Sequence, residues 1–212
     1  MRDEALRKLK EGLLELDKAC TLEAAKALLD ADAGAQAGVD ALAEGLEIVG
    51  RRFQQGDWFL GELVYSGEIA KETTKLLSPH LSAEADEGLG IVVVGTVAGD
   101  MHDLGKNIFN TYAKCAGLEI VDLGTDVSTE QFAEAARKHR PVALGMSCLL
   151  TVCAGGVGRV IEELERDGLR EASNVIVGGA ALTEGFAREV GADAFAPDAV
   201  TGTEIIRAWS ES

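Results

Sequence analysis

The sequence predicts an α + α/β protein, in which an N-terminal four-helix bundle is followed by a Rossmann-like domain with a flavodoxin-like, five-stranded parallel sheet. Three observations lead to this fold class. Apolar residues recur at helical spacing between residues 6 and 77, short apolar runs alternate with helical patterns between residues 91 and 209, and a polar stretch separates the two patterns. We therefore expect two domains, a helical domain at 1–85 and an α/β domain at 86–212.

Capping and breaking residues mark the expected ends of the four helices. Thr21 is expected to be the N-cap of the second helix, because its hydroxyl can accept a hydrogen bond from a free amide of the first turn. Breaking residues between 30 and 38 end that helix, and Gly56 separates the third helix from a fourth at about 59–77. Helices joined by such short connections pack as antiparallel neighbours, which predicts a small bundle.

A proline and a run of polar residues within 78–88 predict a linker, with a domain boundary near residue 85. Beyond it, strand and helix patterns alternate. The expected strands are 91–95, 119–123, 142–146, 174–178 and 193–196. The expected helices are 105–116, 129–138, 156–166, 183–190 and 200–209. Alternation of this kind is typical of βαβ units around a parallel sheet.

Charge and composition exclude several classes of partner. The formal net charge is −16 at pH 7, and such a field repels nucleic-acid phosphates and anionic lipids. No apolar run is long enough to cross a bilayer, and the charged start of the chain does not fit a signal peptide. We expect a cytoplasmic protein without a membrane or nucleic-acid partner. The cysteines form no C-x-x-C pair, as is usual for reduced thiols, and they are Cys20, Cys115, Cys148 and Cys153.

The loop after the first expected strand carries the most distinctive chemistry. Asp100 precedes His102 by two residues on a glycine-containing loop. A carboxylate that accepts the proton of one ring nitrogen leaves the other nitrogen free and basic enough to bind a metal. A loop histidine beside an aspartate is also common as a hydrogen-bonded turn residue, so this pair alone leaves both interpretations open.

Two further loops reach the same edge of the expected sheet, where ligands bind in open α/β folds. The loop after the third strand offers Ser147 and Thr151 on either side of Leu149, which suits a flat heterocycle that needs one hydrogen bond in an apolar slot. The loop after the fourth strand contains Gly178 and Gly179, which either let a ligand lie against the main chain or form a tight turn. No G-x-G-x-x-G motif follows the first strand, so a dinucleotide site of the usual kind is not indicated.

Together these motifs resemble those of the cobalamin-binding modules of methionine synthase and of the corrinoid proteins in methylotrophic methyltransferase systems. The matching residues are D-x-H-x-x-G at Asp100, His102 and Gly105, S-x-L at Ser147 and Leu149, and the pair Gly178 and Gly179. In the helical part, the segment 53–60 is similar to the cap segment of that family, so the first domain resembles a helical cap. The resemblance covers nearly the whole chain.

The resemblance implies cobalamin as the cofactor, in its methylcobalamin and cob(I)alamin forms. His102 would be the lower axial ligand of cobalt, and Asp100 would orient the ring and tune its basicity. The dimethylbenzimidazole tail would leave cobalt and enter the α/β domain, where Ser147 would hydrogen-bond its nitrogen and glycines would leave it room. Phe53 and Leu60 would cover the upper, methyl-carrying face. The same resemblance assigns further cofactor contacts to Met101, Asp103, Gly105, Leu149, Thr151, Gly178, Gly179 and Ala199.

One position departs from the family pattern. The methionine synthases continue the aspartate–histidine relay to a serine, at the position that Cys153 fills in this chain. A thiol is a weaker hydrogen-bond donor and acceptor than a hydroxyl. We therefore expect proton delivery to Asp100 to differ from that in methionine synthase.

The implied function is that of a corrinoid methyl carrier, which accepts a methyl group on cobalt and passes it on. The chain would be a non-autonomous, cobalamin-carrying subunit of a methyltransferase system, because the cofactor carries the chemistry and separate proteins hold donor and acceptor. Its implied partners are a donor-specific methyltransferase, a second methyltransferase that uses tetrahydrofolate or a thiol, and a reductive activase.

Two alternatives share parts of this pattern. An adenosylcobalamin-dependent light sensor would explain Trp58 and Glu68, which form the W-x9-E part of the sensor signature, but Ile69 stands where that signature has histidine. The charge of −16 is also unsuited to DNA. The cobalamin subunit of a carbon-skeleton mutase shares D-x-H-x-x-G, but such modules do not usually carry the helical cap.

Overall fold

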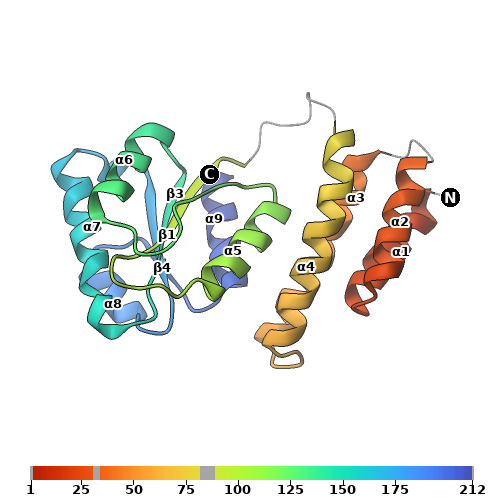
Figure 1. Cartoon of the computed structure of the whole chain (residues 1–212), viewed down its shortest axis with the longest axis horizontal. Coiled ribbons are helices and arrows are strands. Elements are labelled where there is room, and N and C mark those ends of the chain that lie inside the picture. The colour runs from red at the N-terminus through yellow and green to blue at the C-terminus, as the bar shows by residue number, and fades with distance from the viewer. Residues whose placement is uncertain (1, 31–33, 82–88, 212) are drawn as a thin grey trace. The chain divides into compact units, whose positions relative to one another are not determined.

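The computed structural model describes residues 2–30, 34–81 and 89–211. They belong to two compact units, the first within Met1–Glu87 and the second within Gly88–Ser212 (Figure 1). The first part of the linker expected at 78–88 forms a short 3-10 helix, Ser78–His80. The remainder at 82–88, with the boundary expected near residue 85, lies outside the described residues. Within the described part of the chain, no helix is both long and apolar enough to cross a membrane.

The first unit, as described, is built from the four predicted α-helices. They are α1 (Arg2–Leu14), α2 (Lys18–Asp30), α3 (Ala35–Gln54) and α4 (Leu60–Leu77). The apolar positions of the helical pattern turn inward, so that one face of each helix is buried. Side chains with no exposed surface include Leu9, Leu13, Leu28, Leu42, Val49, Ile69 and Leu77.

The expected N-cap at Thr21 is wrong, because α2 begins three residues earlier, at Lys18. Thr21 is buried inside the bundle, and its hydroxyl donates a 2.8 Å hydrogen bond to the carbonyl oxygen of Asp17. Asp17 is the capping residue, since its Oδ1 accepts a 2.9 Å hydrogen bond from the backbone N–H of Cys20. A threonine is tolerated inside a helix when its hydroxyl bonds back to a main-chain carbonyl in this way.

The second unit contains a five-stranded sheet in the order β2-β1-β3-β4-β5, with every neighbouring pair parallel. The strands are β1 (Ile91–Thr96), β2 (Glu119–Asp122), β3 (Ala143–Ser147), β4 (Asn174–Gly178) and β5 (Ala194–Ala196). This order is the flavodoxin-like one, as the sequence predicts.

Helices cover both faces of this sheet (Figure 1). They are α5 (Leu104–Cys115), α6 (Thr129–His139), α7 (Gly155–Arg166), α8 (Glu184–Glu189) and α9 (Ala199–Ser210). Neighbouring strand residues point to opposite faces, so Val92 packs in the core under α5 and α9 while Val93 packs in the core under α6 and α7. A capping box forms at the start of α6, since Ser128 and Gln131 exchange hydrogen bonds of 3.3 and 2.9 Å.

Strand register brings the three predicted ligand loops to one edge. Thr96 at the end of β1 is paired with Ser147 at the end of β3, and Ser147 is paired with Gly178 at the end of β4. Because β1 lies between β2 and β3, the chain leaves β1 and β3 in opposite directions, which opens a crevice at the carboxyl ends of these strands. The loops that carry His102 and Leu149 start from the two sides of this crevice.

Candidate functional site

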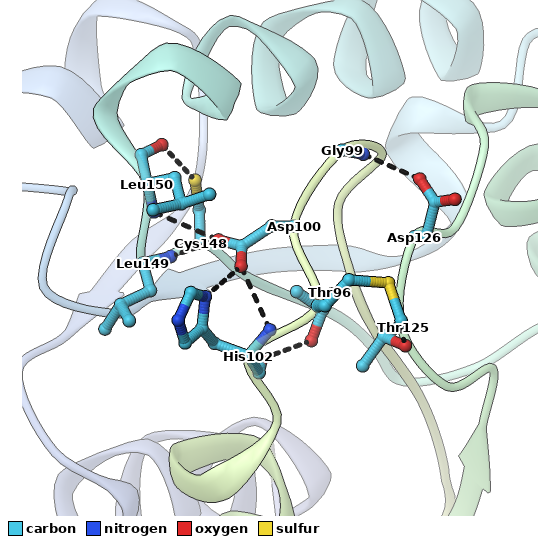
Figure 2. A network of polar contacts seen from close by, with 10 residues as sticks. Thr96, Gly99, Asp100, His102, Thr125, Asp126, Cys148, Leu149 and Leu150 are labelled. Atoms are coloured by element: carbon cyan, nitrogen blue, oxygen red, sulfur yellow. Dashed lines mark hydrogen bonds and ion pairs between the residues drawn. The ribbon is translucent and has the colours of Figure 1, made fainter.

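The imidazole of His102 is held by the carboxylate of Asp100 (Figure 2). Nδ1 of His102 lies 2.7 Å from Oδ1 of Asp100, and the same oxygen accepts a 3.0 Å hydrogen bond from the backbone N–H of His102. The hydroxyl of Thr96 donates to the carbonyl oxygen of His102 at 3.0 Å, which ties the loop back to β1. The His102 side chain is 53% exposed, whereas Asp100 has no exposed surface. Nε2, on the far side of the ring, is therefore open to a ligand.

The second carboxylate oxygen of Asp100 connects this loop to the loop after β3. Oδ2 accepts hydrogen bonds from the backbone N–H groups of Leu149, at 2.6 Å, and Leu150, at 3.0 Å (Figure 2). Burial by itself raises the pKa of Asp100, but the hydrogen bonds from His102, Leu149 and Leu150 outweigh it and lower the pKa to about 2. Asp100 is consequently an anion at neutral pH, and the proton of the contact lies on Nδ1 of His102.

Asp126, which follows β2, supports the same loop and was missed in the sequence. Its Oδ1 accepts a 2.7 Å hydrogen bond from the backbone N–H of Gly99 (Figure 2). Its own N–H donates to the carbonyl oxygen of Asp100 at 3.0 Å. Gly99 has a φ of +84°, a backbone conformation that residues other than glycine rarely adopt. The available signal was an aspartate in a glycine-containing loop at the carboxyl edge of the sheet.

Two buried cysteines lie beside the Asp100 loop. Sγ of Cys148 donates to the carbonyl oxygen of Leu150 at 3.2 Å, and burial together with the negative charge of Asp100 raises the pKa of Cys148 to about 11. A Cβ added at Gly99 would lie 3.1 Å from Sγ of Cys153. The Asp100 carboxylate accepts hydrogen bonds from His102, Leu149 and Leu150.

A pocket of about 160 Å³ lies between the sheet and helices α5 and α9, at the carboxyl ends of β1, β3 and β4. We call it the apolar pocket, because hydrocarbon side chains form most of its lining. Five of the predicted cofactor residues line it: Gly105, Ser147, Gly178, Gly179 and Ala199. Hydrocarbon is supplied chiefly by Val94, Phe109 and Ile176.

Glycine is required at these pocket positions for different physical reasons. A Cβ at Gly105 would meet no atom within 4 Å, so this glycine leaves open space for a ligand. A Cβ at Gly178 would lie 2.9 Å from the carbonyl oxygen of Ala196, and one at Gly179, where φ is +111°, would lie 2.3 Å from that of Cys148. A side chain at Gly178 or Gly179 would therefore disturb the fold before it could obstruct a ligand.

The other predicted contacts lie outside the apolar pocket. Met101 and Leu149 are exposed on the loops beside His102, and Asp103 stands at the start of α5, where its carboxylate accepts a 2.9 Å hydrogen bond from the side chain of Asn107. Thr151 is exposed and begins a short 3-10 helix, so it does not share the pocket with Ser147 as the sequence interpretation expects. The exposed apolar residues of this unit include Met101, Leu104, Leu149, Leu150 and Val152.

A second polar network joins α5 to β2. Nζ of Lys106 lies 2.7 and 2.6 Å from the two carboxylate oxygens of Asp122, and the Lys106 side chain is only 2% exposed. Asp122 also accepts hydrogen bonds from Nδ2 of Asn110, at 2.8 Å, and from the backbone N–H of Gly124, at 2.9 Å. Burial favours a raised pKa of Asp122, but these partners prevail and hold it below the usual range.

In the helical unit, the two predicted cover residues flank the turn between α3 and α4. Phe53 is partly buried at the end of α3, and Leu60 is 47% exposed at the start of α4. Phe59, Val64 and Tyr65 are also exposed on this stretch, so apolar surface continues beyond Leu60. Large contiguous apolar patches on a protein surface mark interaction sites, whereas single exposed apolar residues are common.

Comparison with known proteins places both units in one family. Models of the B12 binding domain match residues 90–205 and residues 5–78. The chain is 34% identical over 199 residues to dimethylamine corrinoid protein 1 of Methanosarcina mazei, covering 93% of this chain and 92% of the relative. It is 31% identical over 220 residues to trimethylamine corrinoid protein 2 of Methanosarcina acetivorans, covering 100% and 99%.

Two solved structures of cobalamin proteins also resemble this chain. A cobalamin-binding protein from Desulfitobacterium hafniense superposes with a TM-score of 0.81 at 33% identity, covering 96% of this chain and 98% of that one. A chain of the methanol:cobalamin methyltransferase complex MtaBC from Methanosarcina barkeri superposes with a TM-score of 0.85 at 25% identity, covering 100% and 81%. The similarity thus extends over the helical unit as well as the α/β unit.

The residues fit the cofactor that this family binds. His102 presents an open Nε2 to a metal while a buried carboxylate holds Nδ1. Beside it, Gly105 leaves free space in a pocket of about 160 Å³, and the Ser147 side chain offers a hydroxyl to a heterocycle there. The chain therefore belongs to the B12-binding corrinoid proteins, and its cofactor is cobalamin.

Proposed function

We propose that the protein is a methyl carrier, which accepts a methyl group on cobalt from a donor-specific methyltransferase and delivers it to a second methyltransferase that uses tetrahydrofolate or a thiol. When bound, the corrinoid supplies a metal that takes up and releases methyl groups. The observation that carries the proposal is the pair of Asp100 and His102, in which a buried carboxylate holds a half-exposed imidazole at the same edge of the sheet as the apolar pocket.

The chain's own residues hold and orient the cofactor in this proposal. His102 would bind the metal through Nε2, and Asp100 would keep the proton on Nδ1 and the ring in place, because hydrogen bonds to both of its oxygens immobilise the carboxylate. Ser147 would donate to the ring nitrogen of the cofactor's tail, for which Gly105 leaves space. Phe53 and Leu60 would keep water from the methyl-carrying face.

The names of the relatives support the proposed partners. Two of the curated relatives are named for dimethylamine and trimethylamine, which favours a methylated amine as the donor that the first methyltransferase holds. The carrier would also need a reductive activase, since a corrinoid whose metal has been oxidised by accident no longer accepts a methyl group. The light-sensor alternative finds no support at Ile69, which is fully buried in the helical core and offers no metal ligand.

Electron paramagnetic resonance of the cobalt(II) holoprotein tests the axial role of His102. Protein labelled with ¹⁵N-histidine should show a doublet superhyperfine splitting from the axial nitrogen in place of the ¹⁴N triplet. His102→Ala should lose this splitting, whereas His139→Ala, at the far end of α6, should keep it. A triplet that persists in the labelled protein would show that the benzimidazole nitrogen is the ligand, and would overturn the assignment.

A labelled methyl group tests the carrier role. Holoprotein loaded with [¹⁴C]methylcobalamin, mixed with a thiol and the thiol-dependent methyltransferase of a methylamine system, should transfer the label to the thiol. Label that stays on the protein, combined with a light-dependent change of oligomeric state in the adenosylcobalamin form, would favour the sensor instead. The two outcomes are mutually exclusive predictions of the two functions.

A further inference from the structure

The floor of the apolar pocket is made of hydrocarbon, and strand register determines it. Val94 is paired with Gly145, and Gly145 is paired with Ile176, in one row across β1, β3 and β4. Residues two apart in a strand point to the same face, so this row lies beneath Ser147 on the α5 and α9 side. A Cβ at Gly145 would lie 3.3 Å from Val94 and 3.7 Å from Ile176, so these two side chains flank the floor on either side of Gly145.

The charged side chains in the pocket lining are already engaged. Lys106 is held by both carboxylate oxygens of Asp122. Asp198 caps α9, where Oδ1 accepts from the backbone N–H of Thr201 at 2.8 Å and Oδ2 accepts from its hydroxyl at 3.0 Å. Neither group can turn to a ligand without breaking an ion pair or a helix cap. In the described lining, Ser147 is the polar side chain whose hydrogen-bonding capacity is unused.

We propose that the apolar pocket selects cobamide tails with a benzimidazole base over tails with a purine base. The inference rests on the proposed function, which assigns this pocket to the tail. A benzimidazole linked to its ribose has one free ring nitrogen, which Ser147 can bind, and a hydrocarbon edge that can face Val94 and Ile176. One hydrogen bond and an apolar floor therefore satisfy the whole base.

An adenine base of similar outline brings two more ring nitrogens and an exocyclic amine. Pointed at Val94 and Ile176, these atoms lose their bonds to water and find no side-chain partner. Each buried polar atom left unpaired should weaken binding roughly 10- to 100-fold. The discrimination arises at the floor, whereas the hydrogen bond from Ser147 serves both kinds of base equally.

Spectroscopic titration of the apo full-length chain tests this selectivity with three probes. They are cobalamin, its analogue with adenine in place of dimethylbenzimidazole, and cobinamide, which lacks the nucleotide tail. After correction for the independently measured detachment of each tail from cobalt, cobalamin should bind roughly tenfold or more tightly than the adenine analogue. If the corrected affinities for cobalamin and the adenine analogue are equal, and both exceed the affinity for cobinamide, the pocket binds the tail without selecting its base. That result would overturn the proposed selectivity. Cobalamin binding no tighter than cobinamide would instead refute the placement of the tail.

Two threonine variants locate the source of the selectivity. Val94→Thr puts a hydroxyl at the pocket floor with little change of shape, and should narrow the preference for cobalamin by giving the purine a partner. Val92→Thr, on the same strand and face but outside the lining, carries the same chemical change and should leave the preference unchanged. When the preference for cobalamin over the adenine analogue is compared between two variants, the detachment of each tail from cobalt in solution cancels. A preference altered equally by both variants would contradict the assignment to the floor.

Ser147→Ala supplies a measurement that does not depend on how well the valine variants fold. This substitution should weaken the binding of cobalamin and of the adenine analogue by similar factors, because both bases offer a ring nitrogen to the hydroxyl. Loss of affinity for cobalamin alone would show that Ser147, not the floor, distinguishes the bases, and would overturn the proposal.

Discussion

At the scale of single residues, Asp100 is fixed by hydrogen bonds to both of its carboxylate oxygens. It has no exposed surface, and both of its carboxylate oxygens accept backbone or imidazole N–H groups from two loops. Those donors favour the anion strongly enough to overcome its burial, so the pKa of Asp100 falls to about 2. One carboxylate thus positions the histidine and fastens the two ligand loops to each other.

Asp100→Asn should therefore be costly although it preserves the size of the side chain. The amide NH₂ would face an N–H donor on one side or the other, leaving a buried donor unpaired at a cost of about 1–3 kcal/mol. Chemical denaturation should show that loss, and the cobalt(II) spectrum should show a weakened histidine splitting. Asp103→Asn, whose carboxylate accepts from the Asn107 side chain at the surface, is the matched control. Unchanged stability in Asp100→Asn would contradict the reading of the network.

At the scale of secondary-structure elements, the ion pair of Lys106 and Asp122 joins the first turns of α5 to the end of β2. It lies within a few residues of His102 and borders the apolar pocket, so it fixes the helix against which the tail would lie. Removing one member of a buried ion pair destabilises the folded protein, because the charge of the other member is left uncompensated.

The pH dependence of stability reports on this pair. The pKa of Asp122 is below its ordinary value in the folded protein, so the unfolded chain binds the proton at higher pH. The stabilisation is present above the ordinary carboxyl pKa and is lost as pH falls through the folded one. Asp122→Asn should lower the melting temperature at pH 7, and its difference from wild type should shrink as the solution is acidified below about pH 4. A difference that stays constant down to pH 3 would show that Asp122 is not the titrating group.

At the scale of the whole molecule, the protein consists of two compact units, each with a core of its own. The α/β unit holds the metal ligand and the pocket, while the helical unit carries exposed apolar residues at Leu60 and its neighbours. A methyl group on cobalt must be covered while the carrier waits and accessible when a partner binds. We propose that the helical unit provides this cover and withdraws it.

Replacing both Phe53 and Leu60 with alanine tests the cover. Because Phe53 is only partly buried and Leu60 is half exposed, the variant should melt close to wild type and bind cobalamin normally. Photolysis of its methylcobalamin form and air oxidation of its reduced form should both be faster. Leu42→Ala, at a fully buried core position, should lower the melting temperature without changing these rates. A double variant that melts early but keeps wild-type photolysis would assign both residues to the core.

Much of this architecture follows from local patterns. The two-residue period of strands, the three-to-four-residue period of helices and the alternation between them predict the parallel sheet and the helical bundle. The same patterns place Asp100, His102, Ser147 and Gly178 at one edge, because loops that follow parallel strands all emerge there. The error at Thr21 arises because Asp17 and Thr21 are both good capping residues, which the local pattern does not distinguish. Packing decides that Thr21 is the buried one.

Contacts between residues far apart in the chain depended on the tertiary structure. The amides of Leu149 and Leu150 satisfy Asp100 across nearly 50 positions of sequence, and Lys106 is neutralised by Asp122 from another element. Gly178 and Gly179 are glycines because neighbouring main chain crowds them, whereas Gly105 faces open space. No periodicity encodes these distinctions. They arise when strand register and helix packing bring separate segments within a few ångströms, where sterics and the pairing of buried polar groups select the residue.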